Sequence, residues 1–264
     1  MWDKYEALKQ TLIEMERVLV AFSGGIDSSL VLKAAHDVLG ADTLAVLGSS
    51  PSIPQYEQSE AREIAREIGT ELVVLDKHEL EDPRFVENTP DRCYFCKAGI
   101  CDELMSYAQA HGYRYVVDGS NADDVGDYRP GSRAAREYGM RSPLQEVGLT
   151  KAEIRLLAKE LGLPNWNKPS SACLVSRIPY GDTIDEATLI QIGKAEQLLL
   201  DLGFRELRVR HHNAIARIEV PVQDFASMME HREFIVASFK ALGYTYVTLD
   251  LTGFRSGSMN EVLS

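Results

Sequence analysis

Up to about residue 162, short apolar runs rich in β-branched residues alternate with longer segments whose apolar residues recur at helical spacing. Such runs are typical of strands buried in a parallel sheet. Their alternation with helices indicates βαβ units. We therefore predict an α/β fold, a doubly wound parallel sheet. The predicted strands are 17–22, 42–48, 71–76 and 113–119. The predicted helices are 3–15, 28–40, 56–69, 95–111 and 150–162, the last beginning with a capping box at Thr150 and Glu153.

The pattern changes near residues 178–182. We predict a helix at 184–202 and a pair of strands at 205–220. A second helix at 222–242 and a final strand at 244–251 follow. The two paired strands would meet in a turn at Asn213-Ala214. The sequence therefore predicts two domains, a sheet domain at 1–178 and a small C-terminal α+β domain at 179–264, which we expect to bind substrate and to mediate oligomerisation.

Composition excludes several classes of protein. The opening MWDKYEALKQ is polar and charged, and no apolar run approaches the roughly 20 residues of a membrane span. We therefore expect a cytoplasmic protein with no membrane partner, in which clustered cysteines are metal-binding or catalytic rather than paired in disulfides. The net charge of −12 argues against nucleic acid as the main partner, because phosphate neutralisation normally requires a basic surface.

The string SGGIDSS, residues 23–29, lies between a predicted strand and a predicted helix. A glycine-rich turn lets backbone N–H groups approach a phosphate, and the helix N-terminus contributes a partial positive charge there. The loop has neither the GxxxxGK[ST] pattern nor GxGxxG. It therefore predicts a phosphate site of another kind.

Three of the four cysteines lie within nine residues, in the string RCYFCKAGIC. Cys93 and Cys96 have the spacing of a soft-metal pair, which fits zinc with further ligands or an iron–sulfur cluster. Cys101 follows Cys96 by five residues on a predicted helix, a spacing that does not put the two side chains squarely on one face. We therefore interpret Cys101 as a spare or buried thiol. Cys173 lies in PSSACLVSRIPYG, whose serines and arginine offer donors that lower the pKa of a thiol.

The loop SGGIDSS resembles the pyrophosphate loop of the N-type ATP pyrophosphatases, also called PP-loop enzymes. The resemblance implies cleavage of ATP to AMP and pyrophosphate, with adenylation of a substrate. It also implies that Asp27 helps to hold Mg²⁺. The residues that would cradle the leaving pyrophosphate are Ser23, Gly24, Gly25, Ser28 and Ser29.

Further strings extend the resemblance over nearly the whole chain, to the LarE family of sulfur transferases. They are DGSNADDVGDYRPG, PSSACLVSRIPYG, RVRHHNAIARIEVP and GFRSGSMNE. The resemblance implies adenylation of a carboxylate of pyridinium-3,5-biscarboxylic acid mononucleotide and delivery of sulfur to give a thiocarboxylate, in nickel-pincer nucleotide biosynthesis for lactate racemase. It also implies a homo-oligomer, a hexamer built as a trimer of dimers. The source of the sulfide that would reload the enzyme is not implied.

The LarE family has two kinds of member. In one kind, a cysteine matching Cys173 gives up its own sulfur; in the other, three cysteines bind a [4Fe–4S] cluster that carries the sulfide. Cys93, Cys96 and Cys173 match the second pattern, so the resemblance implies that Cys173 is both a cluster ligand and catalytic. Sacrificial donation from Cys173 is the alternative, and a PP-loop tRNA thiolase is the nearest rival enzyme.

Other candidate site residues carry weaker signals. Arg208 and Arg210 share one face of a predicted strand, where two guanidinium groups suit a substrate phosphate. The alternative is that they pair at the surface with Glu206 or Glu219. Acidic side chains follow the fourth predicted strand at Asp118, Asp123 and Asp124, and they are either ligand-binding or a solvated turn. Glu196 is either part of a metal or substrate site or a solvated position on its helix.

Overall fold

The computed structural model describes residues 1–124, 130–169 and 172–255. Its residues form two compact units, one made of 1–50, 55–85 and 91–171, and the other of 51–54, 86–90 and 172–264. The domains predicted at 1–178 and 179–264 stay a prediction. None of the helices in the described part of the chain combines the length and the apolar character needed to span a membrane.

The first unit contains a parallel sheet with the strand order β3-β2-β1-β4. Its strands are β1 (Val18–Phe22), β2 (Thr43–Ser49), β3 (Glu71–Asp76) and β4 (Tyr115–Val117). In the register of the sheet, Val18 of β1 lies opposite Thr43 on one side and Tyr115 on the other. The parallel sheet predicted from the apolar runs is confirmed, although β4 is shorter than its predicted strand.

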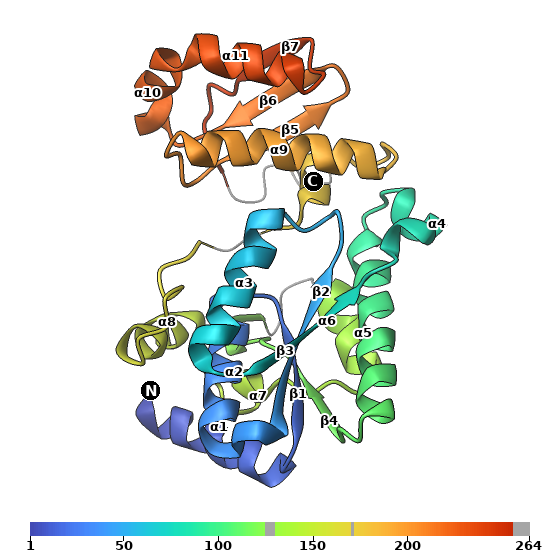
Figure 1. Ribbon diagram of the computed structural model, residues 1–264, viewed down its shortest axis with the longest axis vertical. Coiled ribbons are helices and arrows are strands. Elements are labelled where there is room, and N and C mark those ends of the chain that lie inside the picture. The colour runs from blue at the N-terminus through green and yellow to red at the C-terminus, as the bar shows by residue number, and fades with distance from the viewer. Residues whose placement is uncertain (125–129, 170–171, 256–264) are drawn as a thin grey trace. The chain divides into compact units, whose positions relative to one another are not determined.

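Helices cover both faces of this sheet (Figure 1). They are α1 (Trp2–Met15), α2 (Ile26–Leu39), α3 (Gln55–Ile68), α4 (Pro83–Val86), α5 (Arg92–Ala110), α6 (Pro130–Glu137), α7 (Pro143–Glu146) and α8 (Lys151–Glu160). On one face, buried side chains of α1, α2, α3 and α8 form a core that includes Leu8, Leu30 and Leu157. On the other face, α5 and α6 pack through Leu104 and Ala135. The doubly wound α/β class is therefore confirmed.

The second unit contains a three-stranded sheet with the order β5-β6-β7. β5 (Arg208–His212) and β6 (Ile215–Glu219) are antiparallel, and β7 (Tyr246–Leu249) runs parallel to β6. The predicted turn between the first two strands is present, with Asn213 in the left-handed region at φ 52°.

The α-helices in the described part of the second unit are α9 (Glu186–Asp201), α10 (Phe225–Glu230) and α11 (Arg232–Ala241). They pack on the sheet through a core that includes Leu199, Ile218 and Phe239. The single helix predicted over 222–242 is wrong: a 3-10 turn (Val222–Asp224) comes first, and His231 separates α10 from α11.

Candidate active site

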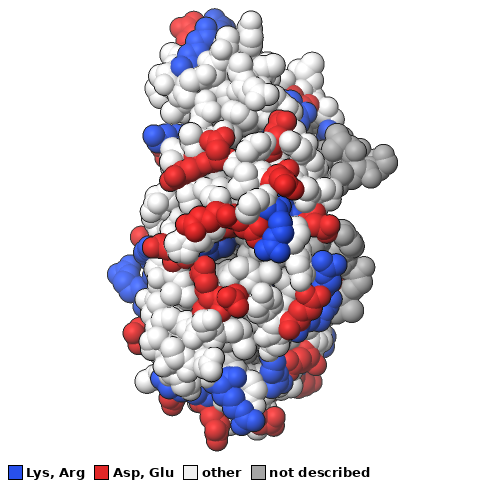
Figure 2. All heavy atoms as spheres, turned by 90° about the vertical axis from the view of Figure 1, so that its right-hand side faces the viewer, with Lys and Arg blue, Asp and Glu red and all other residues white. Residues whose placement is uncertain are grey.

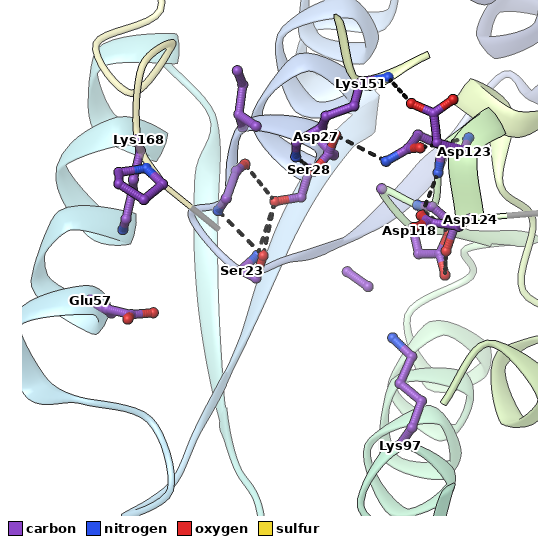
Figure 3. A pocket seen from close by; sticks show the side chains of 17 residues that line it. Ser23, Asp27, Ser28, Glu57, Lys97, Asp118, Asp123, Asp124, Lys151 and Lys168 are labelled. Carbon is purple, nitrogen blue, oxygen red and sulfur yellow. Dashed lines mark hydrogen bonds and ion pairs between the residues drawn. The ribbon is translucent and has the colours of Figure 1, made fainter. Parts of the chain in front are cut away.

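A cavity formed by described residues of the first unit lies at the carboxyl ends of β1 and β4, where the order of the strands reverses. Loops from neighbouring strands diverge at such a point and leave a crevice in which ligands bind. The cavity has a volume of about 680 Å³. Its lining includes Ser23, Gly25, Asp27 and Ser28 from the phosphate loop, Asp118 to Asn121 after β4, and the side chains of Lys97, Lys151 and Lys168 (Figure 3).

The phosphate loop is a tight turn between β1 and α2. Gly24 has φ +71°, and a Cβ on it would lie 2.8 Å from the Cβ of Ala61, so only glycine fits. The hydroxyl of Ser28 lies 3.2 Å from that of Ser23, accepts from the Ser23 N–H at 3.3 Å and donates to the carbonyl of Gly25 at 3.1 Å. The two serine hydroxyls are thereby held at the cavity wall, beside the N-terminus of α2.

Two residues predicted to bind phosphate lie behind this wall. Ser29 is fully buried, and neither it nor Gly24 lines the cavity. Both are held by Asn165, whose side-chain amide donates to the Gly24 carbonyl and to the Ser29 hydroxyl, each at 2.9 Å. Asn165 was missed by the sequence reasoning, because nothing in its local string PNWNKP connects it with a loop 140 residues earlier.

Asp27 is the acidic side chain of the loop. Its carboxylate forms an ion pair with Lys151 and accepts from the amide of Asn121 at 3.4 Å. Lys151 is the first residue of α8 and lies within the predicted capping box, directly after its N-cap Thr150. The box is confirmed: the Thr150 hydroxyl accepts from the Glu153 N–H, and the Glu153 side chain accepts from the Thr150 N–H. The box therefore fixes the backbone that delivers Lys151, another residue that the sequence reasoning missed.

The segment after β4 forms the facing wall. Asp118 is buried and accepts from the Ser120 N–H and hydroxyl and from the Ser142 hydroxyl, at 2.8–3.1 Å. A Cβ on Gly119 would lie 2.6 Å from the backbone nitrogen of Ser28, so glycine allows this wall to approach the phosphate loop. Lys97 extends toward the cavity from α5 (Figure 3). The cavity thus combines backbone donors, cations and carboxylates, which is the set that a magnesium–polyphosphate needs.

Cys93 and Cys96 both lie in the first turns of α5, which begins three residues earlier than predicted. Residues three apart share a helix face, so the two thiols are neighbours. Cys93 is exposed and Cys96 half-buried. The Lys77 ammonium donates to the Cys96 sulfur at 3.2 Å; burial lowers the pKa of Lys77, but Cys96 and Glu79 outweigh it and raise that pKa overall.

Cys101 differs from the other thiols. It is fully buried and donates to the Met140 sulfur at 3.2 Å. Burial raises the pKa of its thiol, which favours the unreactive protonated form. The structure thus shows Cys101 as a buried thiol, and the interpretation that it is spare stays a prediction.

The remaining predicted residues belong to the second unit. Cys173 is exposed and precedes a 3-10 turn (Leu174–Arg177). On β5, Arg208 donates to the Leu207 carbonyl at 2.7 Å and stacks on Phe254 at 5.1 Å. Arg210 is buried and pairs with Glu219 at 2.8 Å. Among the residues described, no three His, Cys, Asp or Glu side chains gather into a metal site. Parts of the strings quoted for the resemblance, 125–129, 170–171 and 256–261, lie outside the described residues.

Comparison with known proteins agrees with this geometry. The family model described as asparagine synthase matches residues 5–172. The parallel sheet, the phosphate loop and this match define the class, a PP-loop α/β domain of the asparagine synthase family.

Curated relatives narrow the family. The chain is 43% identical over 262 residues to the pyridinium-3,5-bisthiocarboxylic acid mononucleotide synthase of Lactiplantibacillus plantarum, covering 99% of this chain and 95% of the relative. An uncharacterised protein of Synechocystis sp. is 44% identical, covering 99% and 98%. The tRNA-specific 2-thiouridylase MnmA of Xanthobacter autotrophicus is 30% identical, but the match covers only 63% of this chain and 52% of MnmA. The chain belongs to the LarE family, and it is an ATP-dependent sulfurtransferase.

Proposed function

We propose that the protein adenylates a carboxylate of pyridinium-3,5-biscarboxylic acid mononucleotide with ATP and then delivers sulfur to it, giving a thiocarboxylate for nickel-pincer nucleotide biosynthesis. The observation that carries the proposal is the match along almost the full length of a relative named for the bisthiocarboxylic acid mononucleotide product. The cavity of the first unit supports the ATP half of the reaction, because its loop residues present hydroxyls and N–H groups beside a helix N-terminus.

In the first half-reaction, a carboxylate oxygen of the substrate attacks the α-phosphorus of ATP and pyrophosphate leaves. We assign the leaving pyrophosphate to the loop of Ser23, Gly25 and Ser28, backed by Gly24 and Ser29. Asp27 would hold Mg²⁺, whose charge offsets what develops on the phosphates. Lys97, Lys151 and Lys168 line the same cavity and add positive charge. The residues assigned here to ATP and Mg²⁺ all belong to the first unit.

In the second half-reaction, a sulfur nucleophile attacks the acyl carbon, and AMP leaves with its electron pair. We propose that Cys93, Cys96 and Cys173 hold a [4Fe–4S] cluster, which would leave one iron without a protein ligand and supply a transferable sulfide. The donor chemistry supports this assignment: Cys93 and Cys96 share an accessible helix face, Cys173 is exposed, and Cys101 is buried. Sacrificial loss of the Cys173 sulfur is the competing route.

The remaining parts of the proposal concern partners. We propose that Arg208 and Arg210 serve the phosphate of the mononucleotide, that the chain assembles as a homo-oligomer, and that it works in the cytoplasm, where its four free thiols would stay reduced.

A second candidate, a tRNA thiolase, is favoured by the similarity to MnmA. The net charge of −12 and the interspersed acidic and basic side chains on the face shown in Figure 2 oppose it, because RNA binding draws on a broad basic surface.

The test is an anaerobic preparation supplied with ATP, Mg²⁺ and either the biscarboxylate mononucleotide or bulk tRNA. We expect pyrophosphate release with the mononucleotide and none above background with tRNA, together with protein-bound iron and acid-labile sulfide. Cys93→Ala, Cys96→Ala and Cys173→Ala should each lose the iron and the sulfur transfer while keeping pyrophosphate release. Cys101→Ala is the matched control and should keep all three.

Mass spectrometry after turnover separates the two sulfur routes. The cluster route leaves the mass of the polypeptide unchanged. A loss of about 34 Da, the mass of H₂S expected when a thiol becomes dehydroalanine, would establish sacrificial donation from Cys173 instead. Release of pyrophosphate with tRNA and not with the mononucleotide would overturn the proposed substrate.

A further inference from the structure

A fully buried ion pair lies in the second unit, outside the ATP cavity. Arg177, at the end of the 3-10 turn, donates through Nε and Nη2 to the two carboxylate oxygens of Glu196 on α9, each at 2.8 Å. The two side chains are 2% and 1% exposed. This two-bond geometry holds a guanidinium group in a single orientation. Glu196 is therefore a buried ion-pair partner, and the solvated position considered for it from the sequence is wrong.

The third nitrogen of Arg177 holds the turn that carries Cys173. Nη1 donates to the carbonyl oxygens of Ala172 at 2.6 Å and Cys173 at 3.0 Å, and to the Ser176 hydroxyl at 2.9 Å. The Cys173 carbonyl also accepts from the Ser176 N–H at 3.1 Å and from its hydroxyl at 2.9 Å. The backbone of Cys173 is thus fixed by three donors, while the residue itself is exposed.

The same network connects this turn to β5. One oxygen of Glu196 accepts from the Val209 N–H at 2.9 Å. The neighbouring Arg210 donates to the Ser176 carbonyl at 2.8 Å and to Glu219 at 2.8 Å. The guanidinium groups of Arg177 and Arg210 therefore bind three backbone carbonyls within the five residues 172–176.

Stability alone does not account for this arrangement. A buried ion pair is costly to desolvate, and apolar replacements of similar volume are often as stable. What this pair supplies, and an apolar pair would not, is a set of directed donors aimed at one turn. We propose that Arg177 and Glu196 form a positioning pair that fixes the turn of Cys173, so that its exposed sulfur is held in one place for the transfer step. The proposal rests on the proposed role of Cys173 in sulfur delivery.

The discriminating variant is the double substitution Arg177→Met with Glu196→Gln. It removes both charges together, so no unpaired charge is left buried, and the glutamine oxygen still accepts from Val209. Arg177→Lys keeps the charge and loses the two-bond geometry. The control is Arg232→Met, which breaks an exposed arginine–glutamate pair with Glu233 in the same unit.

Two measurements test the proposal. The first is amide hydrogen exchange on the protein without substrate, at Leu174, Ser176 and Ile178, whose N–H groups bond within this segment or to Ser52. The double variant should lose protection there, while β6 stays protected. The second is the kinetics of the two half-reactions. We expect sulfur transfer to fall by about 10²-fold, because small misplacements have effects of that size, with the KM values for both substrates and the rate of pyrophosphate release within threefold of wild type. In both measurements, Arg177→Lys should fall between the double variant and wild type. The control Arg232→Met should match wild type.

Unchanged protection of the three amides, or wild-type sulfur transfer despite their loss of protection, would overturn the positioning role. So would parallel losses of pyrophosphate release and sulfur transfer, which would indicate general disruption. If wild-type protein itself transfers no sulfur to the mononucleotide, the proposed function fails. The exchange measurement still decides whether the pair holds the turn.

Discussion

At the scale of single residues, the contacts of the Asp27 carboxylate bear directly on how Mg²⁺ would bind. The carboxylate accepts from Lys151 and from Asn121, so it joins α2, α8 and the segment after β4 at one point. A magnesium ion bound by Asp27 would compete with Lys151 for the same oxygens. We infer that Lys151 would then turn toward the phosphates, since both residues line the same cavity.

We predict that Asp27→Ala abolishes pyrophosphate release and leaves the fold intact. The ion pair with Lys151 is partly exposed, and such pairs contribute at most about 1 kcal/mol to stability. The control is Asp37→Ala on the same helix, which removes the similarly exposed pair with Lys33. Pyrophosphate assays and thermal unfolding measure both effects. Near-normal release by Asp27→Ala would show that the loop has been misassigned.

Asn165 acts on the same loop from behind. Its amide is the donor for the Gly24 carbonyl and the Ser29 hydroxyl, both of which are hidden from the cavity. We predict that Asn165→Ala destabilises the first unit by about 1–3 kcal/mol, the cost of leaving buried polar groups unpaired, and raises the KM for ATP. Asn167→Ala, an exposed neighbour in the same turn, is the control. Denaturant unfolding and ATP kinetics should separate the two variants; equal behaviour would contradict the role given to Asn165.

The residues of the site divide by how far their partners lie along the chain. Ser23, Asp27 and Ser28 were predictable, because one local string placed them between a strand and a helix. Lys151, Asn165 and Lys97 were not, because their roles depend on which distant loops the sheet brings together. The distinction between Arg208 and the buried Arg210 was hidden for the same reason, since both occupy one face of a strand.

At the scale of elements, α8 shows how a helix start delivers a functional side chain. Its capping box places Lys151 as the first helical residue, and Glu153 of the box also binds Lys4 of α1 at 2.7 Å. The hydrogen bond from Lys4, followed by that from the Thr150 N–H, lowers the pKa of Glu153 from its ordinary 4.5 to about 2.

This lowered pKa predicts a pH dependence. A carboxyl whose pKa is lower in the folded state stabilises the fold above its unfolded pKa, and the stabilisation is lost as the pH falls from about 4.5 toward 2. We predict that Glu153→Gln lowers stability at pH 7 by about 1 kcal/mol, the typical worth of a cap. The difference from wild type should shrink as the pH falls from 4.5 to 3. Urea unfolding measures it, with the exposed Glu160→Gln on the same helix as control; a difference independent of pH would contradict the assignment.

Helices and strands with a clear pattern of apolar residues were predictable from the sequence. Elements that form because of tertiary packing were not. The bounds of β3 were predicted without error, because its central residues form the continuous apolar run typical of parallel strands, although this edge strand is only half-buried. The short helices α6 and α7 have no such pattern, and they form where the chain packs beside α5 and α1. The break at His231 was missed because apolar residues continue on both sides of it.

At the scale of the whole molecule, the proposed functional residues are divided between two compact units. The first unit holds the phosphate loop, Cys93 and Cys96, and the second holds Cys173, Arg208 and Arg210. Each unit has its own core. We therefore expect the two ligands to leave separate signatures: a non-hydrolysable ATP analogue with Mg²⁺ should protect amides of the phosphate loop, and the mononucleotide should protect amides of β5.

A change at Arg208 tests whether mononucleotide binding can be lost while ATP binding is kept. Arg210 is buried and donates to Glu219 and to the Ser176 carbonyl, so removing it would take a donor from two acceptors and destabilise the fold, although Glu219 also pairs with Arg217. Arg208 is half-buried and donates to a backbone carbonyl, that of Leu207, so we expect it to be changed with less damage to the fold than Arg210. We predict that Arg208→Ala raises the KM for the mononucleotide by about 10- to 100-fold, since a hydrogen bond to a charged group is worth about 1.5–3 kcal/mol. The KM for ATP should not change.

The exposed Arg205→Ala, three residues earlier, is the control for loss of charge and should leave both KM values unchanged. Hydrogen exchange on Arg208→Ala should lose the protection of β5 by the mononucleotide and keep the protection of the phosphate loop by the ATP analogue. An unchanged KM for the mononucleotide, or a matching loss of ATP affinity, would show that the second unit does not bind the substrate phosphate through Arg208.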